Sequence, residues 1–284
     1  MSFDLLNLAL KELGVAMQQC DAKLIIGGGF GLFLLQSQFE FDDLGATLIK
    51  REAWCVSRAT ADLDIFLETT VVASIDKFKS LRKAIDELGY VVISGVEYLH
   101  FEKYFTDTGR VELNFLTGPV TDLSLVPLIK VQRPRVRPKG DVLLHAYLAD
   151  EAINLSDHLL PISKRGSCDF TNLFVPHPAA LLAMKLHAFR DRLERGQTEK
   201  AGHHAVDVYR IVCMLDESLF AETKALFGDA KNMAVVASAA LIVQRYFSTP
   251  DQVGFSRIRE HSLYRSEFAL ETLRSVLIEL LVST

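Results

Sequence analysis

The chain has 284 residues, of which 49% are hydrophobic and 24% are charged, and this composition excludes disordered, collagen-like and coiled-coil chains. Its 31 lysines and arginines against 36 aspartates and glutamates give a formal net charge of −5, which excludes a global positive field that would attract nucleic acid or anionic lipid. The four cysteines stand far apart without a C-x-x-C pair, which speaks against a zinc ribbon or a disulfide framework.

At roughly 150 residues per domain, the length predicts two domains. The most apolar stretches fall short of the ~20 residues that cross a bilayer, and the first residues lack a basic region followed by an apolar run. We therefore expect a folded, soluble, cytoplasmic protein without a membrane partner.

The N-terminal part alternates between helical and strand patterns. Apolar residues at three- and four-residue spacing indicate helices, and strict alternation of apolar and polar residues indicates strands. The predicted elements are a helix over 3–20, a strand over 23–26, a helix over 30–39, a strand over 60–67, a helix over 74–88, and strands over 90–93, 98–105 and 110–116.

The second half of the sequence is mainly helical. Before it, residues 130–139 carry the densest basic run, and their two prolines predict an extended edge or loop. The helices predicted after this run span 179–195, 205–214, 218–227, 232–246 and 263–281. We therefore expect an α+β fold with a mixed, twisted sheet in a core over 1–165, followed by a helical domain over 166–284 that closes over a cleft.

Three carboxylates in predicted strands carry the chemistry. Asp62 and Asp64 lie two positions apart, so both side chains project from one face of their strand. Two carboxylates that close repel each other without a counter-charge, and such hard oxygen ligands suit Mg²⁺ bound together with phosphates. Glu112 lies on the polar side of a later strand and could be the third acid. One or two Mg²⁺ held there would support in-line attack on an α-phosphate.

A glycine turn precedes these strands. Gly27, Gly28 and Gly29 lead from a strand into a helix, and such a turn lets backbone N–H groups approach a triphosphate without side-chain obstruction. The turn is not a Walker A motif, because no G-K-[ST] follows, and it lacks a convincing Rossmann pattern. The order of glycine turn, D-x-D strand and glutamate strand gives it weight.

These motifs resemble the polymerase-β-type nucleotidyltransferase superfamily, and within it the AbiEii/AbiGii-type toxin nucleotidyltransferases. The similarity includes the glycine turn and the run from Arg58 through Thr60 to Asp62 and Asp64, which resembles R-x-[ST]-x-D-x-D. Helical motifs around Lys185 and Asp207 are also similar, and the matched blocks span about residues 24–212.

The resemblance implies a nucleotidyltransferase that transfers a nucleoside monophosphate from an NTP to an acceptor hydroxyl. It implies Asp62 and Asp64 as metal ligands, Glu112 as third acid, Lys185 on the triphosphate and Asp207 as a supporting or catalytic acid. Arg58 and Thr60 would help to bind the nucleotide with the three glycines. A tRNA 3′ end or a protein side chain would be the acceptor, and an antitoxin would be the partner.

Several alternatives remain open at this level. Gly29 replaces the hydroxyl residue usual in the family, which favours a non-catalytic nucleotide-binding regulator, and an antibiotic-type enzyme acting on small molecules would use the same acids. Each acid could also lie on a solvated face, Asp207 could simply pair with Arg210, and His203 could be an extra site residue one turn before Asp207.

Overall fold

The computed structural model describes residues 3–41, 46–57, 62–105, 109–165, 168–169 and 172–282. The chain forms two compact units. Unit 1 comprises residues 1–38 and 58–176, and unit 2 comprises residues 39–57 and 177–284. The expected division at residue 165 differs from this grouping, because residues 173–176 form a strand that pairs within the sheet of unit 1.

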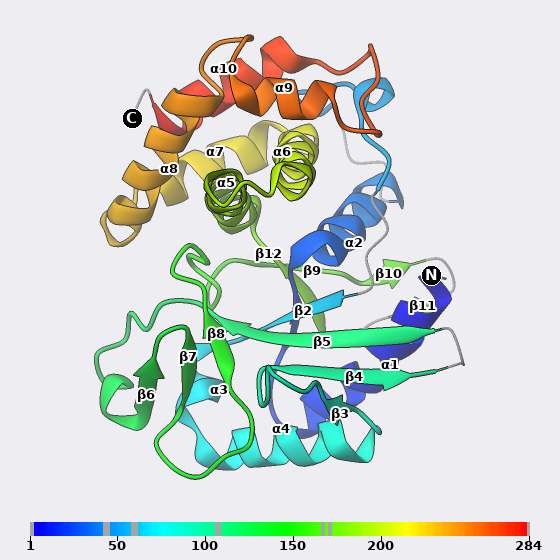
Figure 1. The fold of residues 1–284 in the computed structure, drawn as a ribbon, viewed down its shortest axis with the longest axis vertical. Helices are drawn as coiled ribbons and strands as arrows, with labels where there is room; N and C mark the ends of the chain where they lie inside the picture. Colours follow the sequence, from blue (N-terminus) through cyan, green and yellow to red (C-terminus); the bar gives the residue numbers. More distant parts are fainter. Residues whose placement is uncertain are drawn as a thin grey trace. The chain divides into compact units, whose positions relative to one another are not determined.

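Unit 1 is built on a mixed sheet (Figure 1). Its main path runs in the order β6 (Ile129–Gln132), β7 (Arg135–Pro138), β8 (Ala146–Leu148), β5 (Arg110–Thr117), β2 (Asp62–Leu67), β1 (Leu24–Ile26), β12 (Leu173–Pro176) and β9 (Leu159–Pro161). Two further strands, β4 (His100–Tyr104) and β3 (Val91–Val92), extend from β5, and β10 (Lys164–Arg165) pairs separately with β11 (Cys168–Asp169).

The core of unit 1 lies under one face of this sheet. The helices α1 (Phe3–Gln19), α3 (Thr69–Ala73) and α4 (Ile75–Glu87) lie on that side (Figure 1). Alternate strand residues such as Leu63 and Leu113 are completely buried there, as expected for strands with one covered face. The opposite face therefore carries the alternating polar residues of β2 and β5.

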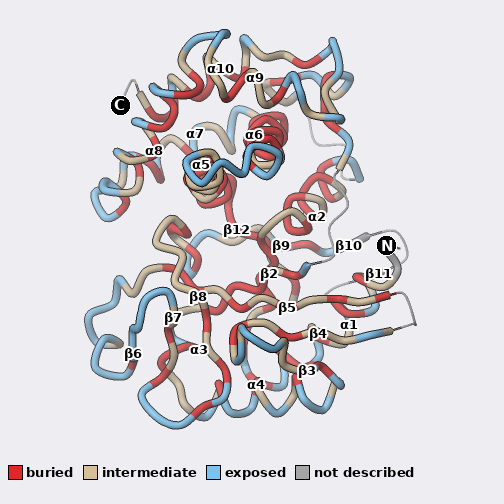
Figure 2. Tube along the Cα trace, viewed as in Figure 1, coloured by how far each residue is buried: buried red, intermediate tan, exposed pale blue. Residues whose placement is uncertain are grey.

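Unit 2 is helical. It contains η1 (Arg51–Ala53), α5 (Pro178–Glu194), α6 (Thr198–Cys213), α7 (Glu217–Phe227), η3 (Ala230–Asn232), α8 (Met233–Tyr246), α9 (Val253–Arg259) and α10 (Leu270–Leu281). Most of α6 is buried (Figure 2). The helix α2 (Gly28–Phe41) continues from unit 1 into the segment 39–57, and this segment joins unit 2 through hydrogen bonds from Leu48 N–H to Leu215 O and from Tyr209 Oη to Ala53 O.

Most predicted elements up to residue 117 are present with small shifts at their ends. Ser74 caps α4 as its sequence position suggests, since its Oγ accepts from Lys77 N–H. The basic run 130–139 forms the β6–β7 hairpin, which confirms that it is extended.

Two helix predictions in unit 2 are wrong in their limits. The helix predicted from 205 begins at Thr198, because packing overrides the low helix propensity of Gly202 and its histidine neighbours. The helix predicted from 263 begins at Leu270, and α9 was not predicted. Phe268 stacks on Tyr209 with ring centroids 4.4 Å apart, and Ala269 N–H donates to Tyr209 Oη. Tertiary contacts therefore fix this segment outside a helix.

In the described part of the chain, no single helix is both long and apolar enough to cross a membrane. One bent pair, Glu217–Phe227 with Ala230–Tyr246, reaches the required length and composition together, with a 70° bend between its helices.

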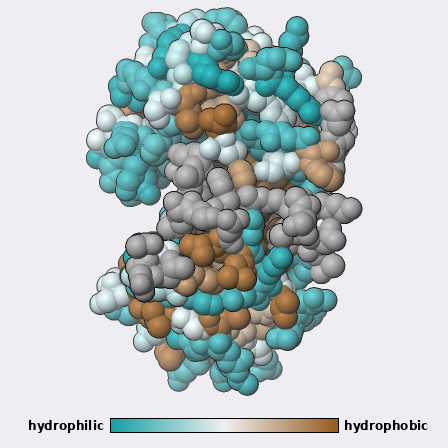
Figure 3. All heavy atoms as spheres, turned by 90° about the vertical axis from the view of Figure 1, so that its right-hand side faces the viewer, coloured by the Kyte–Doolittle hydropathy of each residue, from teal (hydrophilic) through white to brown (hydrophobic). Residues whose placement is uncertain are grey.

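On the face drawn in Figure 3, apolar residues form patches among polar ones.

Candidate active site

The glycine turn lies directly against the D-x-D strand. Gly28 has a φ of +63°, and a Cβ there would overlap the carboxylate of Asp64. A Cβ at Gly27 would overlap the ring of Phe66, and Gly27 N–H donates to Asp64 O at 2.8 Å. Both positions thus require glycine, one for close approach and one also for its left-handed backbone. Gly29 lies in the first turn of α2, which begins one residue after Gly27.

The three predicted acids lie on one face of the sheet. β2 and β5 run parallel, with Asp62 opposite Glu112 and Asp64 opposite Asn114. Their intervening residues Leu63 and Leu113 are buried on the other face, whereas Asp62 is exposed and Asp64 and Glu112 are half-buried. The fold therefore pairs strands whose acids are 50 residues apart in the sequence. The alternation predicts only that each acid lies on the polar face of its strand.

Asn114 fixes the position of the Asp64 side chain. Its Nδ2 donates to Asp64 Oδ1 at 3.0 Å. Its Oδ1 is buried and has no hydrogen-bond partner among the described residues. A buried polar atom left unpaired is uncommon in proteins and calls for a ligand or water partner. Asn114 lies two positions after Glu112, and its role was missed because the strand alternation alone gave it no separate signal.

Glu112 is engaged by a neighbouring arginine. Arg110 forms ion pairs with Glu112 and, at 2.8 Å, with Glu102 on β4. The charge of Glu112, followed by contacts with other side chains that include Glu102, raises the pKa of Arg110. In the described residues, no three His, Cys, Asp or Glu side chains gather closely enough to hold a metal ion. Carboxylate oxygens are the ligand type that Mg²⁺ prefers, but the Glu112 carboxylate is paired with Arg110.

Lys185 and Asp207 form a buried ion pair in unit 2. Lys185 Nζ on α5 lies 2.6 Å from Asp207 Oδ2 on α6, and Arg210 lies 3.1 Å from Asp207 Oδ1. Arg210 also donates to Ser57 Oγ at 3.2 Å. The side chains are 8%, 1% and 1% exposed for Lys185, Asp207 and Arg210. Buried charges need such partners, and the three together carry one net positive charge.

The remaining predicted residues have different outcomes. Arg58 and Thr60 lie outside the described residues. His203 contacts His261, with Nδ1 and Nε2 2.8 Å apart, beside a cavity of about 370 Å³ that also contains Arg257. His261 gave no signal in the sequence because it lies 58 residues from His203.

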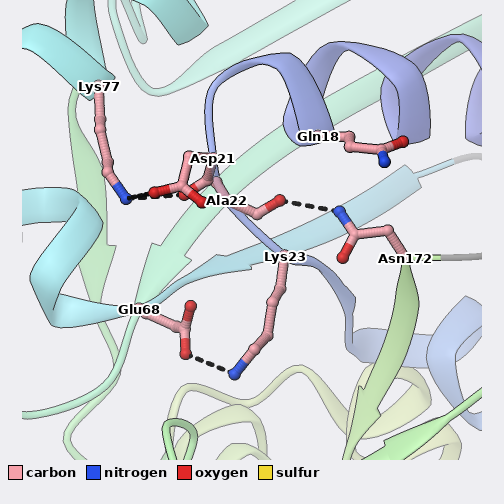
Figure 4. A pocket seen from close by; sticks show the side chains of 7 residues that line it. All are labelled: Gln18, Asp21, Ala22, Lys23, Glu68, Lys77 and Asn172. Atoms are coloured by element: carbon pink, nitrogen blue, oxygen red, sulfur yellow. Dashed lines mark hydrogen bonds and ion pairs between the residues drawn. The ribbon is translucent and has the colours of Figure 1, made fainter.

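A second cavity of about 360 Å³ lies where β2 ends, at the other end of this strand from Asp62 (Figure 4). Lys23 pairs with Glu68 at 2.9 Å and Lys77 pairs with Asp21 at 2.7 Å. The two positive charges of this cavity are thus each matched by an acid, so it shows no preference for an anion or a cation.

The basic hairpin continues the acidic face of the sheet. Arg135 lies opposite Tyr147 on β8, and Tyr147 lies opposite Leu116 on β5. Because paired residues project from the same side, these side chains share a face with Glu112. The Tyr147 ring also packs edge-on against the His100 ring, with the ring centroids 5.6 Å apart. Positive and aromatic groups therefore lie on the same sheet face as the carboxylates.

Comparison with protein-family models, curated proteins and solved structures finds no match.

Proposed function

We propose that the chain is a Mg²⁺-dependent nucleotidyltransferase that transfers a nucleoside monophosphate from an NTP to an acceptor hydroxyl and releases pyrophosphate. One observation carries this proposal: the pairing of β2 with β5 places Asp62, Asp64 and Glu112 on one sheet face, with Asp64 against the glycine turn. Acids from two strands beside a turn without side chains suit a metal-bound triphosphate.

The metal would be held by Asp62, Asp64 and Glu112, as one or two Mg²⁺ ions. When bound, Mg²⁺ supplies positive charge that stabilises the attacking and leaving oxygens of the transfer. Asn114 keeps the Asp64 carboxylate in a fixed orientation through its hydrogen bond. Glu112 would accept the proton of the acceptor hydroxyl once it leaves Arg110.

The phosphates would be bound by backbone and by positive side chains. The first N–H groups of a helix have no partners inside that helix and favour anions, so Gly28 and Gly29 at the start of α2 suit a triphosphate. Gly27, whose N–H donates to Asp64 O, would contribute by leaving room without a side chain. The family resemblance adds Arg58 and Thr60 to this set. It also adds Lys185, with Asp207 as its supporting acid; in the structure these two side chains form a buried ion pair within unit 2.

The acceptor is proposed to be an RNA 3′ end, such as that of a tRNA. Arg135 and Arg137 lie on the sheet face that carries the acids, and positive groups with nearby aromatic rings suit a single-stranded polynucleotide. From the resemblance to toxin nucleotidyltransferases we further propose that the chain is a toxin with a cognate antitoxin. A protein side chain is the other acceptor that this resemblance suggests.

A non-catalytic nucleotide-binding regulator is the second candidate. Gly29 lacks the hydroxyl that its counterparts in the family carry, and Glu112 is paired with Arg110 rather than with the other acids. An antibiotic-type enzyme would have the same acids but no use for the basic hairpin.

Labelling identifies both activity and acceptor. The purified chain is incubated with each α-³²P-labelled NTP, Mg²⁺ and, in separate reactions, total RNA, protein or aminoglycosides. We expect label in RNA, loss of labelling in Asp62→Ala, and normal labelling in Asp76→Ala, which removes an exposed acid of α4. Label in protein or aminoglycoside would reassign the acceptor, and absence of label in every reaction would favour the regulator.

A further inference from the structure

Two glutamates face each other across neighbouring strands beside the proposed metal site. Glu102 on β4 and Glu112 on β5 are directly opposed in antiparallel register. Like charges in such a cross-strand pair are destabilising. Arg110, opposite Tyr104 and two positions before Glu112, pairs with both carboxylates. A single guanidinium therefore neutralises part of the negative charge of these two glutamates.

The exposure of these groups allows exchange of the cation. The side chain of Arg110 is 43% exposed, whereas those of Glu102 and Glu112 are 18% and 21% exposed. Ion pairs with such an exposed partner contribute little to stability and are screened by salt. A divalent ion would therefore compete with Arg110 for Glu112, and Glu102 would keep the arginine close after Glu112 has left.

We propose that Arg110 is an internal counter-ion that holds Glu112 away from Asp62 and Asp64 until a divalent cation displaces it. This inference rests on the proposed function, because it assigns regulation to the same acids. Glu102 is then the second partner of the arginine and not a metal ligand. The arrangement makes occupancy of the acid cluster depend on the divalent ion concentration.

Mn²⁺ binding to the full chain without nucleotide tests this inference, read by electron paramagnetic resonance of the free ion. Arg110→Gln removes the competing cation, so we expect the Mn²⁺ dissociation constant to fall about three- to thirty-fold. Arg274→Gln is the matched control, because Arg274 also forms a partly exposed ion pair with a glutamate, Glu271, but within α10. This control is expected to bind Mn²⁺ as the wild type does.

Glu102→Gln separates the two glutamates. It leaves Glu112 as the remaining glutamate partner of Arg110, so we expect weaker Mn²⁺ binding than in the wild type. The double variant Arg110→Gln/Glu102→Gln is expected to match Arg110→Gln. If the double variant binds Mn²⁺ more weakly than Arg110→Gln, Glu102 is itself a metal ligand and the inference is overturned. Circular dichroism verifies that each variant is folded.

The outcomes for the inference and for the proposed function differ. If Arg110→Gln binds Mn²⁺ no more tightly than the wild type, while Asp62→Ala abolishes binding, the counter-ion role of Arg110 is overturned and the proposed metal site is left intact. If neither the wild type nor Arg110→Gln binds Mn²⁺, both the inference and the proposed metal site are overturned.

Discussion

Gly28 shows how one residue links backbone conformation to the proposed chemistry. Its positive φ and its contact with Asp64 both exclude a side chain. The contact places a carboxylate at the start of α2, where helix N–H groups favour negative charge. A side chain here would push Asp64 away from the turn and from its hydrogen bond with Asn114.

Gly28→Ala is expected to lower the free energy of unfolding and to abolish Mg²⁺–NTP binding. The left-handed conformation costs about 1–2 kcal/mol for alanine, and displacement of Asp64 adds to this. Gly95→Ala is the matched control, because Gly95 has a φ of +88° with nothing within 4 Å of the added Cβ. Urea unfolding and calorimetric titration measure both effects. Equal loss of stability and normal binding in both variants would contradict the role of the Asp64 contact.

His145 is expected to make the stability of unit 1 sensitive to acid. Burial, followed by the positive charges of Arg137 and Arg135, lowers the pKa of His145 to about 4, compared with about 6.5 in the unfolded chain. The unfolded chain therefore binds the proton first, so stability is full above about pH 6.5 and is lost as the pH falls toward 4. After allowance for solvent screening, we expect a loss of about 1–2 kcal/mol.

The comparison of wild type with His145→Gln in urea at pH 7.5 and pH 5 measures this contribution. The variant is expected to show a smaller decrease between the two pH values. An equal decrease in both proteins would show that His145 does not carry the acid sensitivity.

At the scale of elements, the helices α5 and α6 are joined by buried charge. Asp207 lies between Lys185 and Arg210, so its removal leaves two buried cations without their shared partner. Asp207→Asn is expected to cost about 3–5 kcal/mol of stability. Lys185→Met leaves the Asp207–Arg210 pair intact and is expected to cost less.

A double-mutant cycle in urea tests this order. The pair Lys185–Asp207 should show a coupling energy of at least about 1 kcal/mol. A larger loss in Lys185→Met than in Asp207→Asn would show that the lysine, not the shared acid, holds the cluster together.

The sequence predicts local elements well and non-local pairings poorly. Alternation shows that Asp62, Asp64 and Glu112 lie on polar strand faces, because side-chain direction follows from neighbouring residues. The register that sets Asp62 opposite Glu112 depends on contacts across 50 residues. The same is true of Arg110, whose partner on β4 is visible only after the strands pair.

Tertiary packing also determines where some helices and units begin and end, which local propensity does not predict. The segment 39–57 joins unit 2 through single long-range hydrogen bonds such as Tyr209 Oη to Ala53 O. The turns before Leu270 are fixed by Phe268 on Tyr209. Neither contact has a periodic pattern in the sequence, so a helix over 263–281 was the natural but wrong expectation.

At the scale of the whole molecule, an acidic chain carries a local basic surface. The net charge is −5, yet Lys130, Arg133, Arg135, Arg137 and Lys139 gather in one hairpin region. Contact with a polyanion is therefore expected to be weak at high salt and confined to unit 1. Arg135→Gln/Arg137→Gln should reduce RNA labelling more than NTP binding, and unchanged labelling would exclude the hairpin from acceptor binding.

The most direct test of the account is the Mg²⁺ dependence of NTP binding, measured by calorimetric titration of the wild type, Asp64→Asn and the control Asp76→Asn. We predict that the wild type and the control bind an NTP tightly only with Mg²⁺, and that Asp64→Asn weakens this binding at least about tenfold. Equal NTP binding with and without Mg²⁺ in the wild type, together with unchanged binding in Asp64→Asn, would contradict the proposed metal site.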